Sequence, residues 1–245
     1  MKKISDYAKL VSGAYDQVLP AGFDLIHTLP YKFGWVLKDS IANEIIVVVR
    51  GTASISDWLQ NAEFDQIQTS LGNIHRGFWE DSNMLYNDIY AKIWAECFPE
   101  LNTSIDKHPR ITFVGHSLGA AIVTIMAARF GADFYIDLVS FNSPRVGDDT
   151  FKANYSLVRR GNTYRLINKL DIVSLVPEGF GYRHVVPSIL HEDYKFGDIL
   201  YNHSIDRWLS VDKYLETEEQ SKLYLEHVSA QDVASHQQDN AFEEL

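Results

Sequence analysis

The chain has 245 residues, of which 46% are hydrophobic and 22% charged, the composition of a folded globular protein. Its 33 acidic and 22 basic residues give a formal net charge of −11, which disfavours nucleic-acid binding and electrostatic capture by an anionic membrane. The single cysteine, Cys97, excludes an intramolecular disulfide and a cysteine-rich zinc site, and a small buried side chain is expected there.

The amino terminus carries two lysines but no signal peptide of the usual type. Lys2 and Lys3 resemble the start of a signal sequence, but Ser5, Asp6 and Lys9 interrupt any apolar segment after them. Elsewhere no apolar run approaches the ~18 residues that cross a bilayer, so no integral membrane segment is expected. These features predict a cytoplasmic protein, with a non-standard export route left open.

Short aliphatic runs alternate with helical patterns along the chain. Four runs are predicted as strands buried on both faces: Ile45–Val49, Ile111–Val114, Leu138–Phe141 and Tyr164–Ile167. Leu118–Phe130 is apolar enough to be a helix packed on the sheet, and Gly131 ends it. Without internal repeats or linkers, residues 1–245 are predicted to form a single α/β domain, with a mostly parallel central sheet flanked by helices.

The first strand leads into Arg50-Gly51-Thr52. Gly51 lets the chain turn away from the sheet edge, so the backbone N–H of Thr52 could stabilise an oxyanion formed at that edge. The alternative is a plain β-turn in which Arg50 is a structural ion-pair partner.

Residues 54–62 have the pattern of a short amphipathic helix. Ser54 and Asp57 form a capping-box pattern. One apolar stripe follows at helical spacing, made of Ile55, Trp58, Leu59 and Ala62. Spacing alone favours a stripe that packs in the core, whereas its position beside the loop at Thr52 suggests a lid that covers the site.

Residues 115–119 read Gly-His-Ser-Leu-Gly, the G-x-S-x-G pattern of a nucleophile elbow. A strand runs directly into this pattern and a helix directly out of it, so Ser117 must lie at a sharp turn that holds its hydroxyl clear of the backbone. The flanking glycines let strand and helix approach closely. The N–H of Leu118, at the start of the helix, would be a second oxyanion donor.

A serine hydroxyl needs a histidine base and an orienting carboxylate, which follow the nucleophile in α/β-hydrolases as acid and then histidine. Asp171 comes just after the strand at Tyr164–Ile167 and is the candidate acid. His184 and His203 are the candidate bases, and position alone favours His203. It follows a strand-like stretch, Tyr194–Tyr201, and precedes Ser204, a good helix N-cap.

The carboxyl-terminal segment near 215–245 differs from the rest of the chain because it is strongly acidic. It holds eight acidic residues and one lysine. A solvated helix with a frayed end is the ordinary interpretation, and a tail that binds a partner or inhibits the site is the alternative.

With these residues assembled, the chain resembles the class 3 lipases, the fungal-lipase-like group of the α/β-hydrolases, from about Ile45 to Leu209. Six ordered motifs carry the resemblance: VVVRGTASISDW, HRGF, VGHSLGAA, SPRVGD, NKLDIVSLVP and NHSIDRWL. The family's secreted fungal members have signal peptides and disulfides, which this chain lacks.

The resemblance implies Ser117 as nucleophile, Asp171 as acid and His203 as base, and gives His184 a structural place. It implies Thr52 and Leu118 as the oxyanion donors and a lid that includes Ile55, Trp58 and Leu59. No metal or organic cofactor is implied.

The expected activity is hydrolysis of carboxylic esters through an acyl-enzyme, most simply by a triacylglycerol lipase whose lid makes transient contact with a lipid surface. Phospholipase A1 and short-chain or feruloyl esterases are the enzymatic alternatives. A non-catalytic binding module on a hydrolase fold is the non-enzymatic one.

Overall fold

The computed structural model describes residues 2–52, 54–55, 64–98, 109–179 and 181–215. The strands are β1 (Asp24–Thr28), β2 (Gly34–Asp39), β3 (Glu44–Val49), β4 (Gln66–Thr69), β5 (Gly72–His75), β6 (Arg110–His116), β7 (Ile136–Phe141), β8 (Thr163–Asn168) and β9 (Ser188–His191). The helices are α1 (Ile4–Asp16), η1 (Pro30–Lys32), α3 (Arg76–Cys97), α4 (Leu118–Phe130), α5 (Asp149–Val158), η3 (Ile172–Leu175), α6 (Ile199–His203) and η4 (Ile205–Trp208).

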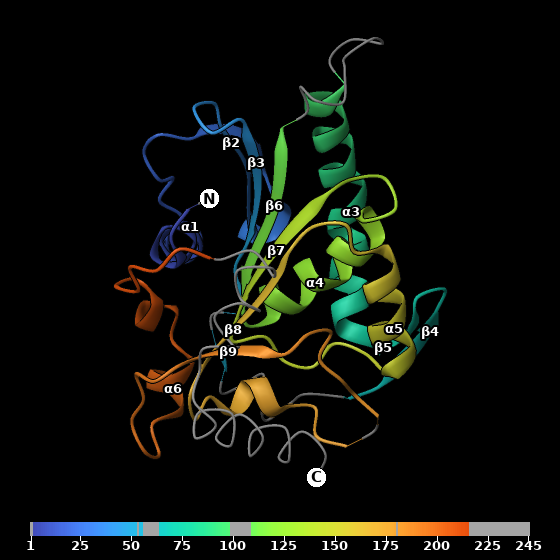
Figure 1. Cartoon of the computed structure of the whole chain (residues 1–245), viewed down its shortest axis with the longest axis vertical. Coiled ribbons are helices and arrows are strands. Elements are labelled where there is room, and N and C mark those ends of the chain that lie inside the picture. The colour runs from blue at the N-terminus through green and yellow to red at the C-terminus, as the bar shows by residue number, and fades with distance from the viewer. Residues whose placement is uncertain (1, 53, 56–63, 99–108, 180, 216–245) are drawn as a thin grey trace, which may run out of the picture.

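Seven strands form one sheet in the order β1-β2-β3-β6-β7-β8-β9, and β4 pairs with β5 as a separate hairpin. The pairs β1–β2 and β2–β3 are antiparallel, whereas β3, β6, β7, β8 and β9 run parallel (Figure 1). The four predicted strands are therefore confirmed, each longer than predicted by one to three residues. Because their carboxyl ends meet at one edge, residues that follow different strands come together there.

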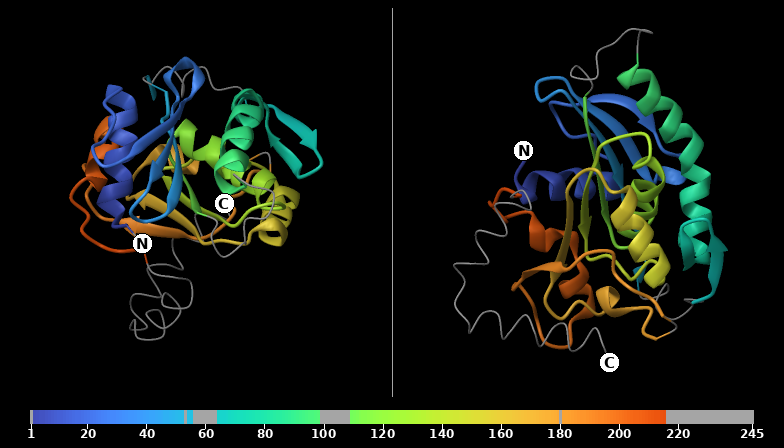
Figure 2. Two further views of the ribbon diagram at one scale, coloured as in Figure 1. Left: turned by 90° about the horizontal axis from the view of Figure 1, so that it is seen from above. Right: turned by 45° about the vertical axis from the view of Figure 1, so that its right-hand side comes forward.

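Both faces of this sheet are buried, which explains the uninterrupted aliphatic run of β3. Ile45, Val47 and Val49 belong to one buried cluster, and Ile46 and Val48 to the other. Helices α3, α4 and α5 cover the first face and α1 covers the second (Figures 1 and 2). A strand with water on one face would instead alternate polar and apolar residues.

Helix α4 spans the predicted residues Leu118–Phe130, and Gly131 is its C-cap. Eleven of its thirteen residues are buried, so it is apolar around nearly its whole circumference. This helix follows β6 directly and packs against β6 and β7, which fixes the turn between β6 and α4 firmly in the fold.

The prediction of a strand-like stretch at Tyr194–Tyr201 is wrong. The sheet ends earlier, with β9, and the chain then turns at Gly197, whose φ is 75°. Asp198 caps α6 by accepting a hydrogen bond from the N–H of Tyr201, so His203 ends a short helix instead of following a strand. Ser204 does cap the next turn, η4, as its type predicts.

Two predicted features fall largely outside the described residues. Of the proposed lid at 54–62, only Ser54 and Ile55 are described, and Trp58 and Leu59 lie outside; the acidic tail lies outside from residue 216 on. The organisation of residues 1–245 as a single domain with these appendages therefore stays a prediction.

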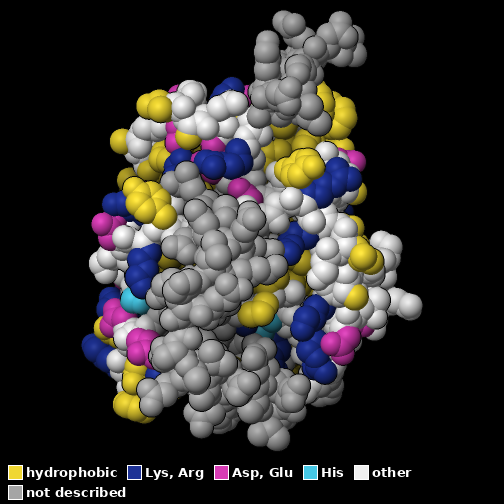
Figure 3. Space-filling view, viewed as in Figure 1, with side chains coloured by type: hydrophobic (Ala, Val, Ile, Leu, Met, Phe, Trp, Pro, Cys, Tyr) yellow, Lys and Arg dark blue, Asp and Glu magenta, His cyan; other side chains and the backbone are white. Residues whose placement is uncertain are grey.

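In the described part of the chain, no helix is long and apolar enough to span a membrane. Where described side chains are visible in Figure 3, Lys and Arg stand in small groups among side chains of other types.

Candidate active site

Ser117 lies at a strained turn between β6 and α4. Its φ of 58° and ψ of −129° place it in a region that residues with a side chain rarely adopt, at an energetic cost on the order of 1–3 kcal/mol. Its N–H donates to the carbonyl of Phe141 at 3.0 Å, which ties the turn to the end of β7. The sharp turn expected from the G-x-S-x-G pattern is present.

Gly115 and Gly119 are required because the backbone segments around this turn touch. A Cβ at Gly115 would lie 2.5 Å from the carbonyl oxygen of Gly119. A Cβ at Gly119 would overlap the carbonyl oxygen of Val49 and lie 2.6 Å from that of Arg50. The start of α4 is thus pressed against the end of β3, where no side chain fits.

The loop after β3 passes beside Ser117. A Cβ at Gly51 would lie 2.8 Å from the Cβ of Ser117 and 2.9 Å from the carbonyl oxygen of His116. Arg50 holds this loop by donating from Nε to the carbonyl of Lys32 and from Nη1 to that of Gly51, each at 2.7 Å. Thr52 therefore follows a backbone segment that contacts the turn at Ser117. Arg50 thus supports this loop through backbone carbonyls. The alternative role, a structural ion-pair partner, finds no acidic partner for Arg50 among the residues that the structure describes.

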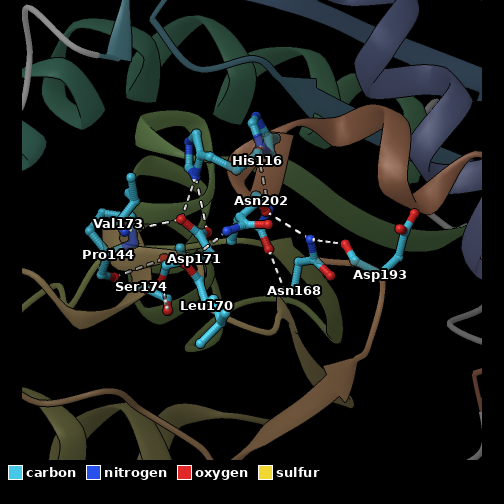
Figure 4. A network of polar contacts seen from close by, with 12 residues as sticks. His116, Pro144, Asn168, Leu170, Asp171, Val173, Ser174, Asp193 and Asn202 are labelled. Atoms are coloured by element: carbon cyan, nitrogen blue, oxygen red, sulfur yellow. Dashed lines mark hydrogen bonds and ion pairs between the residues drawn. The ribbon is translucent and has the colours of Figure 1, made fainter. Parts of the chain in front are cut away.

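Asp171 and His203 are in direct contact. Nδ1 of His203 lies 3.0 Å from Oδ2 and 3.1 Å from Oδ1 of Asp171, and both side chains are buried. Asp171 follows β8, as predicted, and its Oδ1 also accepts the N–H of Val173 at 3.0 Å (Figure 4). Nε2 of His203 is buried and has no hydrogen-bond partner among the described residues. The carboxylate thus orients one ring nitrogen, while the other is available to take a proton.

Buried amides hold the segment that carries His203. Nδ2 of Asn142 donates to the carbonyl of His203 at 3.1 Å, and its Oδ1 accepts the N–H of Asn168 at 2.9 Å. Nδ2 of Asn168 donates to the carbonyls of Asp193 and Asn202, at 2.7 and 3.0 Å (Figure 4). These bonds satisfy polar groups that would otherwise be costly to bury, and they fix the position of the imidazole.

His116 brings the serine and the histidine segments together. This residue precedes Ser117, and its ring centroid lies 4.7 Å from that of His203. Its Nε2 is 2.7 Å from the carbonyl oxygen of His203. Burial, together with the nearby His203, holds the pKa of His116 well below its usual 6.5, so the ring is neutral.

His184, the other candidate base, has a different partner. Its Nε2 lies 2.8 Å from the carbonyl oxygen of Ser174, whose hydroxyl donates to the carbonyl of Asp171 at 2.7 Å. Burial, followed by the positive charge of Arg165, holds the pKa of His184 well below 6.5. His184 therefore supports the loop after Asp171, in agreement with the structural place that the family resemblance implies.

A cavity of about 400 Å³ opens beside this constellation. Thr52, Ile55, Leu200 and His203 are among the residues that line it. Ile55 is 8% exposed, so the described start of the proposed lid is packed inward. Leu118 begins α4, and the first N–H groups of a helix have no acceptor within the helix.

The structure thus joins Asp171 to His203 directly, and links Ser117 to His203 through the adjacent His116. Sequence reasoning did not single out Tyr15, Asn142 or Asn202, although all three bond to this assembly. Asn142 directly follows a predicted strand and Asn202 directly precedes the predicted base, which is a usable signal. Tyr15 lies in an ordinary amphipathic helix, which gives none. In the described ranges no group of three or more His, Cys, Asp or Glu side chains could hold a metal ion.

Comparison with known proteins gives one family. Residues 46–180 match the family described as Lipase (class 3). The chain is 35% identical over 178 residues to secreted mono- and diacylglycerol lipase 1 of Fusarium solani, a match that covers 67% of this chain and 51% of that protein. It is 28% identical over 168 residues to phospholipase A1-II 4 of Oryza sativa subsp. japonica, covering 58% of this chain and 42% of that one.

Among solved structures, the triacylglyceride lipase of Rhizomucor miehei superposes with a TM-score of 0.65 at 23% identity, covering 76% of this chain and 78% of that one. This likeness supports the α/β-hydrolase fold. The chain spans about half the length of the curated relatives it matches.

The expectation of a cytoplasmic protein is wrong in the light of these relatives, because the Fusarium solani lipase is a secreted protein. That expectation came from the interruption of the apolar segment after Lys2 and Lys3 by Ser5, Asp6 and Lys9.

The contact of α4 with β3 makes a stability prediction. Gly119→Ala is expected to lower the free energy of unfolding by about 2 kcal/mol or more, because the new methyl group overlaps two carbonyl oxygens. Gly77→Ala, in α3, is the matched control, since its nearest neighbour would be an ordinary 3.5 Å away. Urea unfolding should give Gly77→Ala a free energy of unfolding near that of wild type. Equal stability of Gly77→Ala and Gly119→Ala would contradict the prediction.

The neutral imidazoles of His116 and His184 should make the free energy of unfolding depend on pH. Because burial keeps their pKa values well below 6.5, the unfolded chain binds protons in mild acid that the folded chain does not. The free energy of unfolding should therefore fall by up to about 2 kcal/mol per imidazole between pH 7 and pH 5. Urea unfolding at several pH values tests this. In His184→Gln the free energy of unfolding should change less steeply with pH than in wild type, and an unchanged pH dependence would contradict the contribution of His184.

Proposed function

Since this chain belongs to the class 3 lipase family, we propose that it is a serine carboxylic-ester hydrolase that acts through an acyl-enzyme. The observation that carries the proposal is the buried contact of 3.0 Å between His203 and Asp171, beside a serine on a strained strand-to-helix turn. A carboxylate, an imidazole and a hydroxyl in this order are the components of nucleophilic acyl transfer. The presence of all three residues at the expected places in the chain supports an enzyme over a non-catalytic binding module.

In the proposed mechanism, Nε2 of His203 takes the proton of the Ser117 hydroxyl as its oxygen attacks the ester carbonyl. Asp171 accepts from Nδ1–H, keeps the required tautomer and stabilises the imidazolium. The backbone N–H groups of Thr52 and Leu118 stabilise the oxyanion. His203 then protonates the departing alcohol, and a water molecule, activated by the same imidazole, hydrolyses the acyl-enzyme.

Acylglycerols are the proposed substrates, because the Fusarium solani relative is a mono- and diacylglycerol lipase. The apolar side chains of Ile55 and Leu200 in the cavity lining are compatible with an acyl chain. Phospholipase A1 activity is the second candidate, favoured by the relative from Oryza sativa. We propose an extracellular location as well, which is supported by the secreted relatives from Fusarium solani and Penicillium cyclopium.

We further propose that residues 54–62, with Ile55, Trp58 and Leu59 on one face, form a lid that meets the lipid surface. The inward packing of Ile55 against the cavity supports this assignment. A rate that rises above the solubility limit of an ester substrate would support the lid, whereas smooth saturation would contradict it.

Removal of the nucleophile should abolish turnover. Ser117→Ala is expected to lower kcat by roughly 10⁶, as in other serine triads. Ser82→Ala is the matched control, because Ser82 is a buried helical serine whose hydroxyl donates to the carbonyl of Trp79 at 2.8 Å. Release of p-nitrophenol from a short-chain ester measures both variants, and near-normal turnover by Ser117→Ala would end the proposal.

The orienting carboxylate makes a second prediction. Asp171→Asn should reduce kcat by about 10⁴ through loss of the correct imidazole tautomer. The same ester assay measures this, with Asp149→Asn as the control, because the Asp149 side chain is 73% exposed and pairs with Arg183. Equal activity of the two variants would remove Asp171 from the mechanism.

The substrate class can be decided with emulsified mono-, di- and triacylglycerols beside phosphatidylcholine, with fatty-acid release as the readout and Ser117→Ala as the blank. Hydrolysis of an acylglycerol at least about tenfold faster than that of phosphatidylcholine is expected. Faster cleavage of phosphatidylcholine would replace the acylglycerol proposal by phospholipase A1.

A further inference from the structure

Tyr15, near the end of α1, bonds to two segments of the proposed active site. Its hydroxyl oxygen accepts the backbone N–H of Gly51 at 2.9 Å and lies 2.8 Å from Nδ1 of His116. The backbone of Gly51 contacts Ser117. His116 directly precedes Ser117 in the sequence. The side chain of Tyr15, from the helix on the face of the sheet opposite α4, thus contacts both the loop of Thr52 and the turn that carries Ser117.

His116 continues the chain of bonds to His203. Its Nε2 lies 2.7 Å from the carbonyl oxygen of His203, and a carbonyl oxygen only accepts, so Nε2 carries the hydrogen. Because the buried ring is neutral, its Nδ1 has no hydrogen and accepts from the hydroxyl of Tyr15. The hydroxyl oxygen in turn accepts from Gly51. Every hydrogen in the series therefore has one possible place.

We propose that Tyr15 and His116 are positioning residues, which hold the loop of the oxyanion donor Thr52 and the segment of the base His203 at a fixed distance on either side of Ser117. This inference rests on the proposed function. It assigns to α1, whose sequence carries no catalytic motif, a direct part in the geometry of the reaction.

The loop of Thr52 and the segment of His203 come from distant parts of the chain, so their relative position depends on contacts that both share. Without the hydroxyl of Tyr15, the N–H of Gly51 loses its acceptor and Nδ1 of His116 loses its donor, so the loop of Thr52 is free to shift. A displacement of about 1 Å near reacting groups can reduce the rate by on the order of 10². The carbonyl of His203 keeps its second bond, from Asn142 at 3.1 Å, so the histidine segment should shift less than the loop.

The same helix supplies a matched control. Tyr7 also lies on α1 and is 2% exposed, and its hydroxyl donates to Glu44 at 3.4 Å, at the start of β3. Tyr7→Phe and Tyr15→Phe thus remove the same atom from the same helix, the first at the amino end of the parallel strands and the second at the carboxyl end. A general weakening of α1 would affect the two variants alike.

The test measures kcat and KM for a soluble p-nitrophenyl ester, together with Tm, for wild type and both variants. Tyr15→Phe should lower kcat by about 10- to 100-fold with little change in KM, because positioning acts on the transition state. Tyr7→Phe should keep the wild-type kcat. A kcat of Tyr15→Phe that is less than about fivefold below that of Tyr7→Phe would overturn the inference.

A second pair of variants keeps the test decisive if Tyr15→Phe does not fold. His116→Gln retains an N–H donor toward His203 and an oxygen acceptor toward Tyr15, whereas His116→Leu retains neither. The glutamine variant should have a kcat at least about fivefold higher than the leucine variant, and equal values would overturn the role of His116. Wild-type turnover that does not depend on Ser117 would instead show that the proposed function itself has failed.

Discussion

The structure depends on the close approach of two backbones, the end of β3 and the start of α4, beside the turn at Ser117. Gly51, Gly115 and Gly119 lie where a single methyl group would overlap a neighbouring segment. The apolar surface of α4, buried against the sheet, supplies the free energy that holds Ser117 in its unfavourable conformation. The strain at Ser117 therefore depends on the packing of α4 in the core, and a change in that packing would also change the conformation of Ser117.

Around this turn the protein buries several polar side chains and bonds them to amides and to the backbone. The carboxylate of Asp171 accepts from an imidazole and from the N–H of Val173. Asn142, Asn168 and Asn202 connect the ends of β7 and β8 to the segment of His203. Neutral amides do this without adding charge, so they fix geometry without competing with Asp171 for the imidazolium that catalysis would generate.

The sequence was most informative where one physical requirement fixed the residue type. Ile45–Val49 could be assigned because a strand covered on both faces must be apolar throughout, and α4 because its apolar run and glycine set both ends. Asp171 could be found because residues after parallel strands gather at one edge. The stretch Tyr194–Tyr201 was wrongly assigned, since a left-handed Gly197 and a capping Asp198 outweigh the aromatic composition typical of strands. Tyr15 gave no signal at all, because its role is defined by partners more than thirty residues away.

The position of α1 links the two ends of the described chain to the reaction centre. Its first residues pair with the last described segment, through the N–H groups of Ile4 and Ser5 and the bridge between Lys3 and Tyr214. Its last turn carries Tyr15. The thirteen residues of this helix therefore connect the chain ends to the segments beside Ser117. If Tyr15 has the proposed positioning role, a fusion partner that displaces the amino-terminal end of α1 would also displace the loop of Gly51.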